Sequence, residues 1–154
     1  MNSISSDNLY PVNNFDYQLL DTGKLKKLER FGPYRFIRPA PQVIWPPKLA
    51  KTEWDEANGE FCHHKGKSTS GGEWIFRNPV PKNGWPLRFQ DLIFTAQTTS
   101  FGHLGLFPEQ AQNWIWIAKQ IKRLNGNKPN VLNMFGYTGA STLVAAERGA
   151  SGTH

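Results

Sequence analysis

The sequence predicts an α+β protein in which a small antiparallel, β-rich N-terminal domain precedes the beginning of an α/β domain. Three observations lead to this fold class. Short aromatic or β-branched segments, separated by Pro, Gly and Asn, fill residues 15–100. A helical apolar pattern covers residues 107–126. An apolar strand pattern then breaks at a glycine and continues as a small-residue helix over residues 130–150.

The chain of 154 residues divides into three expected parts. Residues 1–14 are polar and rich in Asn and Ser, which predicts a flexible tail. Residues 15–100 form the β-rich domain. Residues 101–154 form the incomplete beginning of the α/β domain.

Pro-rich breaks keep the predicted strands of the β-rich domain short, which favours an antiparallel sheet or a small barrel. These strands are expected at 34–39, 42–45, 60–64, 73–77 and 87–97. Alternation along a strand should place Trp74 and Phe76 on one face. Residues 65–72, "KGKSTSGG", are expected to be a mobile loop that joins two strands as a hairpin.

In residues 101–154 we expect two helices and one strand, and the residues at the helix ends support this. Pro108 suits the first turn of the helix expected over 107–126, Glu109 suits its positive end, and Gly126 closes it. A strand is expected over residues 130–135. The helix expected over residues 140–150 has Gly149 near its C-terminal end.

Composition favours a polar, anionic partner without requiring one. The formal net charge is +6, and a basic protein suits RNA. Ordinary solubility explains so modest a charge equally well. The densest basic cluster has an acidic residue, Glu29, inside it, and its cations are the candidate nucleic-acid contacts: Lys24, Lys26, Lys27 and Arg30.

Cysteine usage predicts a reducing compartment. Cys62 is the only cysteine, so no internal disulfide is possible. The N-terminus lacks a secretory pattern and no apolar run has the length of a membrane span. These features predict a soluble, cytoplasmic protein with no membrane partner. His63, His64 and His103 accompany Cys62, but neighbouring strand residues point to opposite faces, so we expect no metal site.

The stretch "VLNMFGYTGAS" (131–141) is the strongest functional signal. A strand that ends in a glycine turn and opens a helix presents free backbone N–H groups and a positive helix end. No Lys follows Gly139, which disfavours a nucleoside triphosphate loop. The Gly136–Gly139 spacing is also too short for the dinucleotide fingerprint. S-adenosylmethionine, which has no phosphate, is the ligand that suits the turn best.

The longer stretch "VLNMFGYTGASTLVAAERGA" resembles the first motif of a family of S-adenosylmethionine-dependent methyltransferases that includes the large-subunit rRNA methyltransferases. The segments "ERFGPYRFIRPAPQVIWP" (29–46) and "FGHLGLFPEQAQNWIWI" (101–117) are similar to the upstream regions of one bacterial branch. The resemblance covers residues 16–150. It implies a Rossmann-like class I methyltransferase domain, S-adenosyl-L-methionine as cofactor, and RNA, in particular rRNA methylation.

The resemblance also implies positions for the cofactor. Gly136 and Gly139 would allow the ligand to approach the backbone, and Thr138 would offer a hydroxyl. At the head of the preceding helix this chain has Ala111 and Gln112 where the family carries an Arg, and Pro108 or Glu109 where it carries an Asp. The implied cofactor-binding residues are Asn133, Phe135, Gly136, Tyr137, Thr138, Gly139, Phe107 and Gln110.

The resemblance further implies that other parts of the site lie after His154. The family's ribose-binding acidic residue would follow the strand that reads "GASGTH" here. We therefore expect an N-terminal fragment of an enzyme, inactive alone and with weak cofactor affinity. No catalytic residue is assigned. The alternative class is a non-catalytic, basic nucleic-acid-binding or interaction module.

Overall fold

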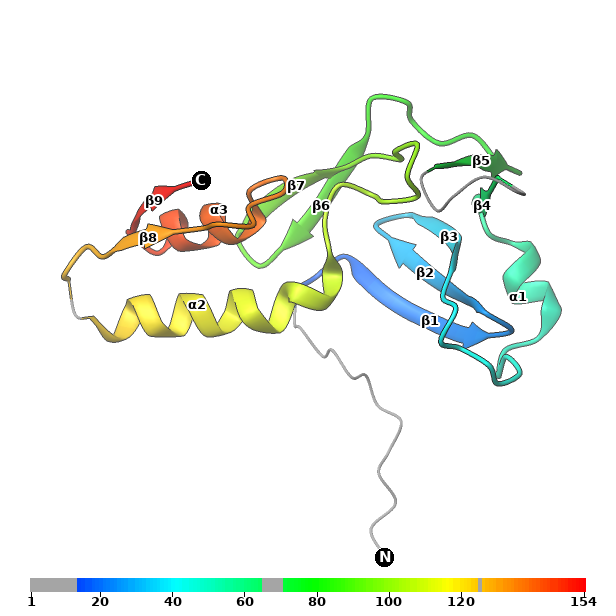
Figure 1. Ribbon diagram of the computed structural model, residues 1–154, viewed down its shortest axis with the longest axis horizontal. Helices are drawn as coiled ribbons and strands as arrows, with labels where there is room; N and C mark the ends of the chain where they lie inside the picture. Colours follow the sequence, from blue (N-terminus) through cyan, green and yellow to red (C-terminus); the bar gives the residue numbers. More distant parts are fainter. Residues whose placement is uncertain (1–13, 65–70, 125) are drawn as a thin grey trace, which may run out of the picture. The chain divides into compact units, whose positions relative to one another are not determined.

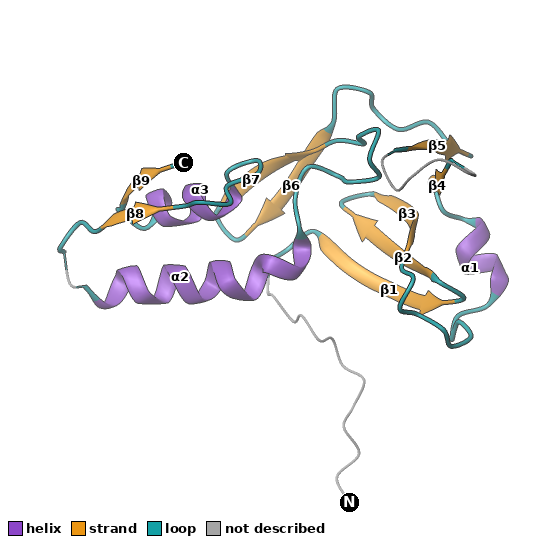
Figure 2. Cartoon of the chain, viewed as in Figure 1, coloured by secondary structure: helices purple, strands orange, loops and turns teal. Residues whose placement is uncertain are grey.

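A computed structural model describes residues 14–64, 71–124 and 126–154 of the chain. The described residues form a mixed, sheet-rich α+β structure (Figure 1). They fall into two compact units, Asn14–Gly105 and Leu106–His154. Figure 2 shows that strands predominate in the first unit, whereas helices carry most of the second. The expected tail (1–14), apart from Asn14, and most of the expected loop at 65–72 lie outside the described residues.

A five-stranded sheet with strand order β1-β2-β3-β4-β5 is the frame of the first unit. The β1–β2, β2–β3 and β4–β5 pairs are antiparallel. Trp74 and Phe76 do share a face of β5, with stacked rings 6.1 Å apart, as expected from strand alternation. The strands are β1 (Tyr17–Gly23), β2 (Lys26–Phe31), β3 (Tyr34–Pro39), β4 (Gly59–His63) and β5 (Gly72–Phe76).

The expectation of a purely antiparallel sheet is wrong at one place. Strands β3 and β4 pair in parallel, with Phe36 opposite Gly59 and Ile37 opposite Glu60. Parallel neighbours need a crossover connection. Residues 40–58 supply it, and they include a short helix that the sequence analysis did not foresee, α1 (Lys51–Asp55).

A strand was also expected at residues 42–45, and this expectation is wrong. The backbone carbonyls of Val43 and Trp45 accept hydrogen bonds from the N–H groups of Leu25 and Lys24, at 2.6 and 2.8 Å. The segment is therefore tied to the turn between β1 and β2 and forms no strand ladder. Of its apolar side chains, Val43 is buried, whereas Ile44 and Trp45 are exposed.

A separate hairpin completes the first unit. The segment expected as one strand at 87–97 forms two, β6 (Trp85–Phe89) and β7 (Leu92–Ala96), because the chain turns at Gln90, which has a φ of 50°. The indole of Trp85 stacks on Phe36 at 5.5 Å. Its Nε1–H donates to the carbonyl of Phe31 at 3.0 Å. Trp85 thus joins the hairpin to the larger sheet.

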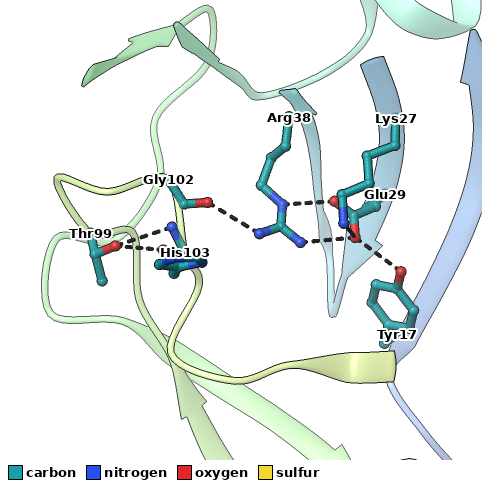
Figure 3. A network of polar contacts seen from close by, with 7 residues as sticks. All are labelled: Tyr17, Lys27, Glu29, Arg38, Thr99, Gly102 and His103. Carbon is teal, nitrogen blue, oxygen red and sulfur yellow. Dashed lines mark hydrogen bonds and ion pairs between the residues drawn. The ribbon is translucent and has the colours of Figure 1, made fainter. Parts of the chain in front are cut away.

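A buried charge network crosses the same core (Figure 3). Glu29 is completely buried, and its carboxylate accepts two hydrogen bonds from Arg38, at 2.7 and 2.9 Å. Lys27 and the hydroxyl of Tyr17 also contact this carboxylate, at 3.1 and 3.0 Å. Strand alternation puts Lys27 and Glu29 on one face of β2.

Arg38 extends this network to a loop far away in sequence. Its Nη1 donates to the carbonyl of Gly102 at 3.1 Å. The Thr99 hydroxyl closes that loop: it donates to the carbonyl of His103 at 3.0 Å and accepts from the N–H of His103 at 3.1 Å (Figure 3). The guanidinium also lies 5.5 Å from the centre of the Phe31 ring. One arginine therefore satisfies a buried carboxylate and fixes the "FGHLG" loop on the sheet.

Opposing effects act on the pKa of Glu29. Burial raises this pKa, but the Arg38 guanidinium and the Lys27 ammonium outweigh burial and hold the pKa below its ordinary value of 4.5. The carboxylate therefore stays ionised in the folded protein at neutral pH.

The second unit consists of a helix pair and a small β-α-β element. A 3-10 turn, η1 (Pro108–Gln110), leads into α2 (Ala111–Arg123). Strand β8 (Asn130–Leu132), helix α3 (Ala140–Glu147) and strand β9 (Ser151–Thr153) follow. The two strands pair in parallel, with Val131 opposite Gly152. The expected order of helix, strand, glycine turn and helix is confirmed, although the strand and helices are shorter than predicted.

The two helices of this unit are joined by a polar contact. Trp114 of α2 is buried, and its Nε1–H donates to the hydroxyl of Ser141 in α3 at 3.1 Å. No helix among the described residues is long and apolar enough to cross a bilayer.

We expect Arg38→Ala to be strongly destabilising. The substitution leaves the Glu29 carboxylate buried without its main partner, which typically costs about 3–5 kcal/mol. The free energy of unfolding in urea measures the effect. Arg35→Ala is the matched control, because Arg35 forms more exposed ion pairs with Glu53 and Glu56 and should cost less than about 1 kcal/mol. Equal losses in the two variants would contradict a structural role for the buried pair.

The network also predicts loss of stability in acid. A carboxyl group with a lowered folded pKa stabilises the fold fully above its unfolded pKa, and this stabilisation is lost as the pH falls through the folded pKa. The free energy of unfolding should therefore fall as the pH drops below 4.5, the ordinary value for Glu29. Glu29→Gln should reduce this acid dependence. An unchanged pH profile in that variant would show that other carboxyl groups account for it.

Candidate functional site

The glycine turn after β8 has the backbone geometry that a close ligand approach requires. Gly139 adopts a left-handed conformation with a φ of 88°, and Tyr137 also has a positive φ of 51°. The N–H of Gly139 donates to the carbonyl of Gly136 at 2.8 Å, which closes the turn. The carbonyl of Gly139 accepts the first helical hydrogen bond, from Leu143 at 2.9 Å. Helix α3 therefore begins directly at the turn, with its first N–H groups free of helical partners.

Gly136 leaves room for a ring to lie against the backbone. A Cβ at this position would overlap the imidazole of His154, which lies against the turn from the end of β9. The same imidazole is 3.7 Å from the position of a Cβ on Gly139. The turn thus accommodates a flat group against Gly136, and a side chain at that position would remove the space, whereas a Cβ on Gly139 would only make ordinary contact with the ring.

Three polar side chains connect the ends of the two parallel strands. Asn133 Nδ2 donates to the hydroxyl oxygen of Thr142 at 2.9 Å. That oxygen also lies 3.2 Å from Nδ1 of His154. Asn133 follows β8, Thr142 lies in the first turn of α3, and His154 follows β9. The three residues meet beside the glycine turn.

The aromatic residues expected at the site do not all lie together. Phe107 precedes η1 and contacts Tyr137 in the turn, with ring centres 4.8 Å apart. Phe135, by contrast, is 93% exposed. Gln110 accepts a hydrogen bond from Asn113 at 2.8 Å. The segment before α2 therefore reaches the glycine turn through Phe107, and the binding role of each of these residues stays a prediction.

Sequence reasoning missed Thr142 and His154 as residues of this site. A hydroxyl one turn into the helix after a glycine turn is a signal for Thr142. For His154 the signal is its place at the end of the second parallel strand, because the carboxyl ends of parallel strands share an edge of the sheet.

The basic residues expected to contact nucleic acid have several partners within the first unit. Lys26 pairs with Glu60, and Lys27 pairs with the buried Glu29. Arg30 donates to the carbonyl of Gly32 at 3.0 Å. Lys24 lies in the turn between β1 and β2 with a φ of 49°. The four cations thus differ in their environment, and their contact with nucleic acid stays a prediction.

Cys62 is half-buried in β4. Burial, together with the nearby Glu60 charge, raises the pKa of its thiol, so the thiolate is disfavoured. Within the described ranges, no group of three or more His, Cys, Asp or Glu side chains could hold a metal ion.

Comparison with known proteins finds a likeness among solved structures. No protein-family model matches the chain, and no curated protein does. Among solved structures, the chain is similar to the SAM-dependent methyltransferase from Agrobacterium tumefaciens, with 37% sequence identity and a TM-score of 0.82. The match covers 90% of this chain and 43% of that one, so the chain spans less than half of that protein's length. This likeness supports the methyltransferase resemblance of the glycine-turn motif.

We expect Thr142→Val to disconnect the polar group beside the turn. Loss of the hydroxyl removes hydrogen-bond contacts to Asn133 and His154 and should cost about 1 kcal/mol of unfolding free energy. The ring nitrogen resonances of His154, followed by NMR, should shift. Thr95→Val is the control, because Thr95 lies exposed in β7. Unchanged His154 resonances in Thr142→Val would contradict the contact.

Proposed function

We propose that this chain carries part of the cofactor site of a Rossmann-like, class I methyltransferase that uses S-adenosylmethionine and acts on RNA. The observation that carries the proposal is the glycine turn between β8 and α3, with its left-handed Gly139 and with Gly136, whose lack of a side chain lets the His154 ring lie directly against the backbone. The 37% identical methyltransferase structure supports the same cofactor.

The residues at the turn fit this cofactor. Backbone N–H groups at the start of α3 suit the carboxylate of its amino-acid part, because the helix N-terminus carries positive potential. The contact between His154 and Gly136 shows that the turn admits a planar ring. Phe107 and Tyr137 provide an apolar aromatic wall. We assign the binding role to these groups, with Asn133 and Thr142 orienting the surrounding polar atoms.

The cofactor supplies an activated methyl group on a sulfonium, and the chain's own residues bind and orient it. Positioning of this kind accounts for much of the rate enhancement in group transfer. We assign no catalytic residue.

We further propose that residues 1–154 alone bind the cofactor weakly and lack methyltransferase activity. The chain spans 43% of the similar methyltransferase, which supports a larger functional unit. Leu132, Met134 and Phe135, in and after β8, are largely exposed. Strands of a parallel α/β sheet are normally covered on both faces, so these side chains suit further cover.

The substrate that we propose is RNA, and rRNA in particular. The net charge of +6 and the family resemblance of the motif support it. A cytoplasmic location accords with this substrate and with a single free cysteine.

The proposal predicts that S-adenosylmethionine perturbs the amide resonances of residues 136–143 in an NMR titration of the full chain. Gly139→Ala should abolish these perturbations, because a Cβ at a φ of 88° strains the turn that faces the ligand. Gly149→Ala is the matched control. Gly149 lies just after the other end of α3 and, like Gly139, has a positive φ, of 92°; it has open space around its Cβ position.

Loss of the perturbations in Gly139→Ala but not in Gly149→Ala is the expected result. Perturbations that are absent from the wild-type chain, or equal in both variants, would contradict binding at the turn.

A further inference from the structure

The segment between β3 and α1 forms an arm that is held firmly against the turn of the β1–β2 hairpin. In Figure 1 this arm, residues 40–50, is the cyan segment that leaves β3. Its backbone accepts hydrogen bonds from Lys24 and Leu25, and the N–H of Ala40 donates to the carbonyl of Leu25 at 2.7 Å. The indole N–H of Trp45 donates to the hydroxyl of Thr22 at 3.0 Å.

Asp21 holds the far end of the arm. Its carboxylate accepts hydrogen bonds from the backbone N–H groups of Lys48 and Leu49, at 3.1 and 2.8 Å, and from the indole of Trp54 at 3.0 Å. Burial raises the pKa of Asp21, but these hydrogen bonds outweigh it and hold the pKa below its ordinary value. The arm is therefore ordered at both ends mainly through its backbone, with the Trp45 indole N–H adding one side-chain contact.

This order exposes apolar side chains to solvent. Ile44 is 82% exposed, Leu25 53% and Trp45 47%. Ala40 and Val43 are the buried residues of the arm. A segment that is tied down by its backbone, with its large apolar residues outward, is typical of a contact surface.

The exposed charges around these residues are mostly positive. Lys24 and Lys48 have no ion-pair partner among the residues that the structure describes. Lys26 and Lys51 pair with Glu60 and Asp55. Lys48 therefore lies near the exposed ring of Trp45 in sequence, and Lys24 lies at the adjacent hairpin turn. Both cations could contact an anionic partner. We name Lys24, Leu25, Ile44, Trp45 and Lys48 the Trp45 surface.

We propose that the Trp45 surface binds a single-stranded segment of RNA, with a base stacked on Trp45 and phosphates contacting Lys24 and Lys48. The proposal rests on RNA as the partner in the proposed function and adds a location for it. Charge complementarity and an ordered, exposed indole are the features that sequence-tolerant single-strand binding uses. A protein partner would need no such excess of unpaired cations.

The test measures binding of a fluorescein-labelled oligouridine of about ten nucleotides to the full chain by fluorescence anisotropy. Trp45→Ala should weaken binding about tenfold, because base stacking on an aromatic residue contributes about 1–3 kcal/mol. Trp116→Ala is the matched control, since Trp116 is 63% exposed on α2, and its affinity should stay within about twofold. Trp45→Phe keeps an aromatic face and should restore most of the affinity.

The lysines are tested by the dependence of affinity on salt. The double variant Lys24→Gln, Lys48→Gln should reduce the slope of log affinity against log salt by about 1.4, since each phosphate contact to a single strand contributes about 0.7. Lys119→Gln, Lys122→Gln on α2 is the control and should leave the slope unchanged.

Several outcomes would overturn the proposal. Equal affinities of Trp45→Ala and Trp116→Ala would place RNA binding elsewhere and leave the proposed function intact. Equally tight, Trp45-dependent binding of duplex RNA would refute the single-strand assignment. If Trp45→Ala reduced self-association of the chain without weakening RNA binding, the Trp45 surface would be a protein contact instead. A wild-type chain that binds no RNA would refute this surface and the RNA part of the proposed function, whereas the cofactor titration would still test the turn.

Discussion

The first unit depends on one buried ion pair. Glu29 sits in the middle of the sheet core, and Arg38 neutralises it from the neighbouring strand while also binding the Gly102 carbonyl. Without Arg38, the carboxylate would lose its main counter-charge and the "FGHLG" loop its anchor. Because a charge this deeply buried needs a complete set of partners, the pair restricts how β2, β3 and the loop can pack. The hairpin of β6 and β7 then packs on the same core through Trp85.

The second unit depends on a backbone constraint rather than on a charge. Gly136 and Gly139 allow the chain to turn from β8 into α3 while a ring lies against the turn. The ring is the His154 imidazole, and the Thr142 hydroxyl lies within hydrogen-bond distance of both this ring and Asn133, while Phe107 contacts Tyr137 beside the turn. This combination suits a ligand with a charged amino-acid end and flat, less polar parts. A phosphate cradle would instead need the glycine and lysine pattern that the turn lacks.

The charges of β2 are distributed differently in the sheet than along the sequence. In "KLKKLERF" the lysines and arginine look like one basic cluster with a single acid inside it. In the sheet, alternation sends Lys27 and Glu29 to the core face, and Lys26 pairs with Glu60 of β4. Apparent charge density in the sequence therefore overstates the free positive charge of β2. Lys24 at the hairpin turn and Lys48 on the neighbouring arm have no ion-pair partner among the described residues, and they lie near exposed apolar residues.

The sequence by itself determined the strand at 34–39 and the order of helix, strand, glycine turn and helix in the second unit. These follow from local periodicity and from the conformational freedom of glycine, which act between near neighbours. Only the tertiary structure decided the parallel β3–β4 pair, the arm at 42–45, the burial of Glu29, and the meeting of Asn133, Thr142 and His154. Each of these depends on partners distant in the chain, and local patterns carry no information about which distant groups will meet.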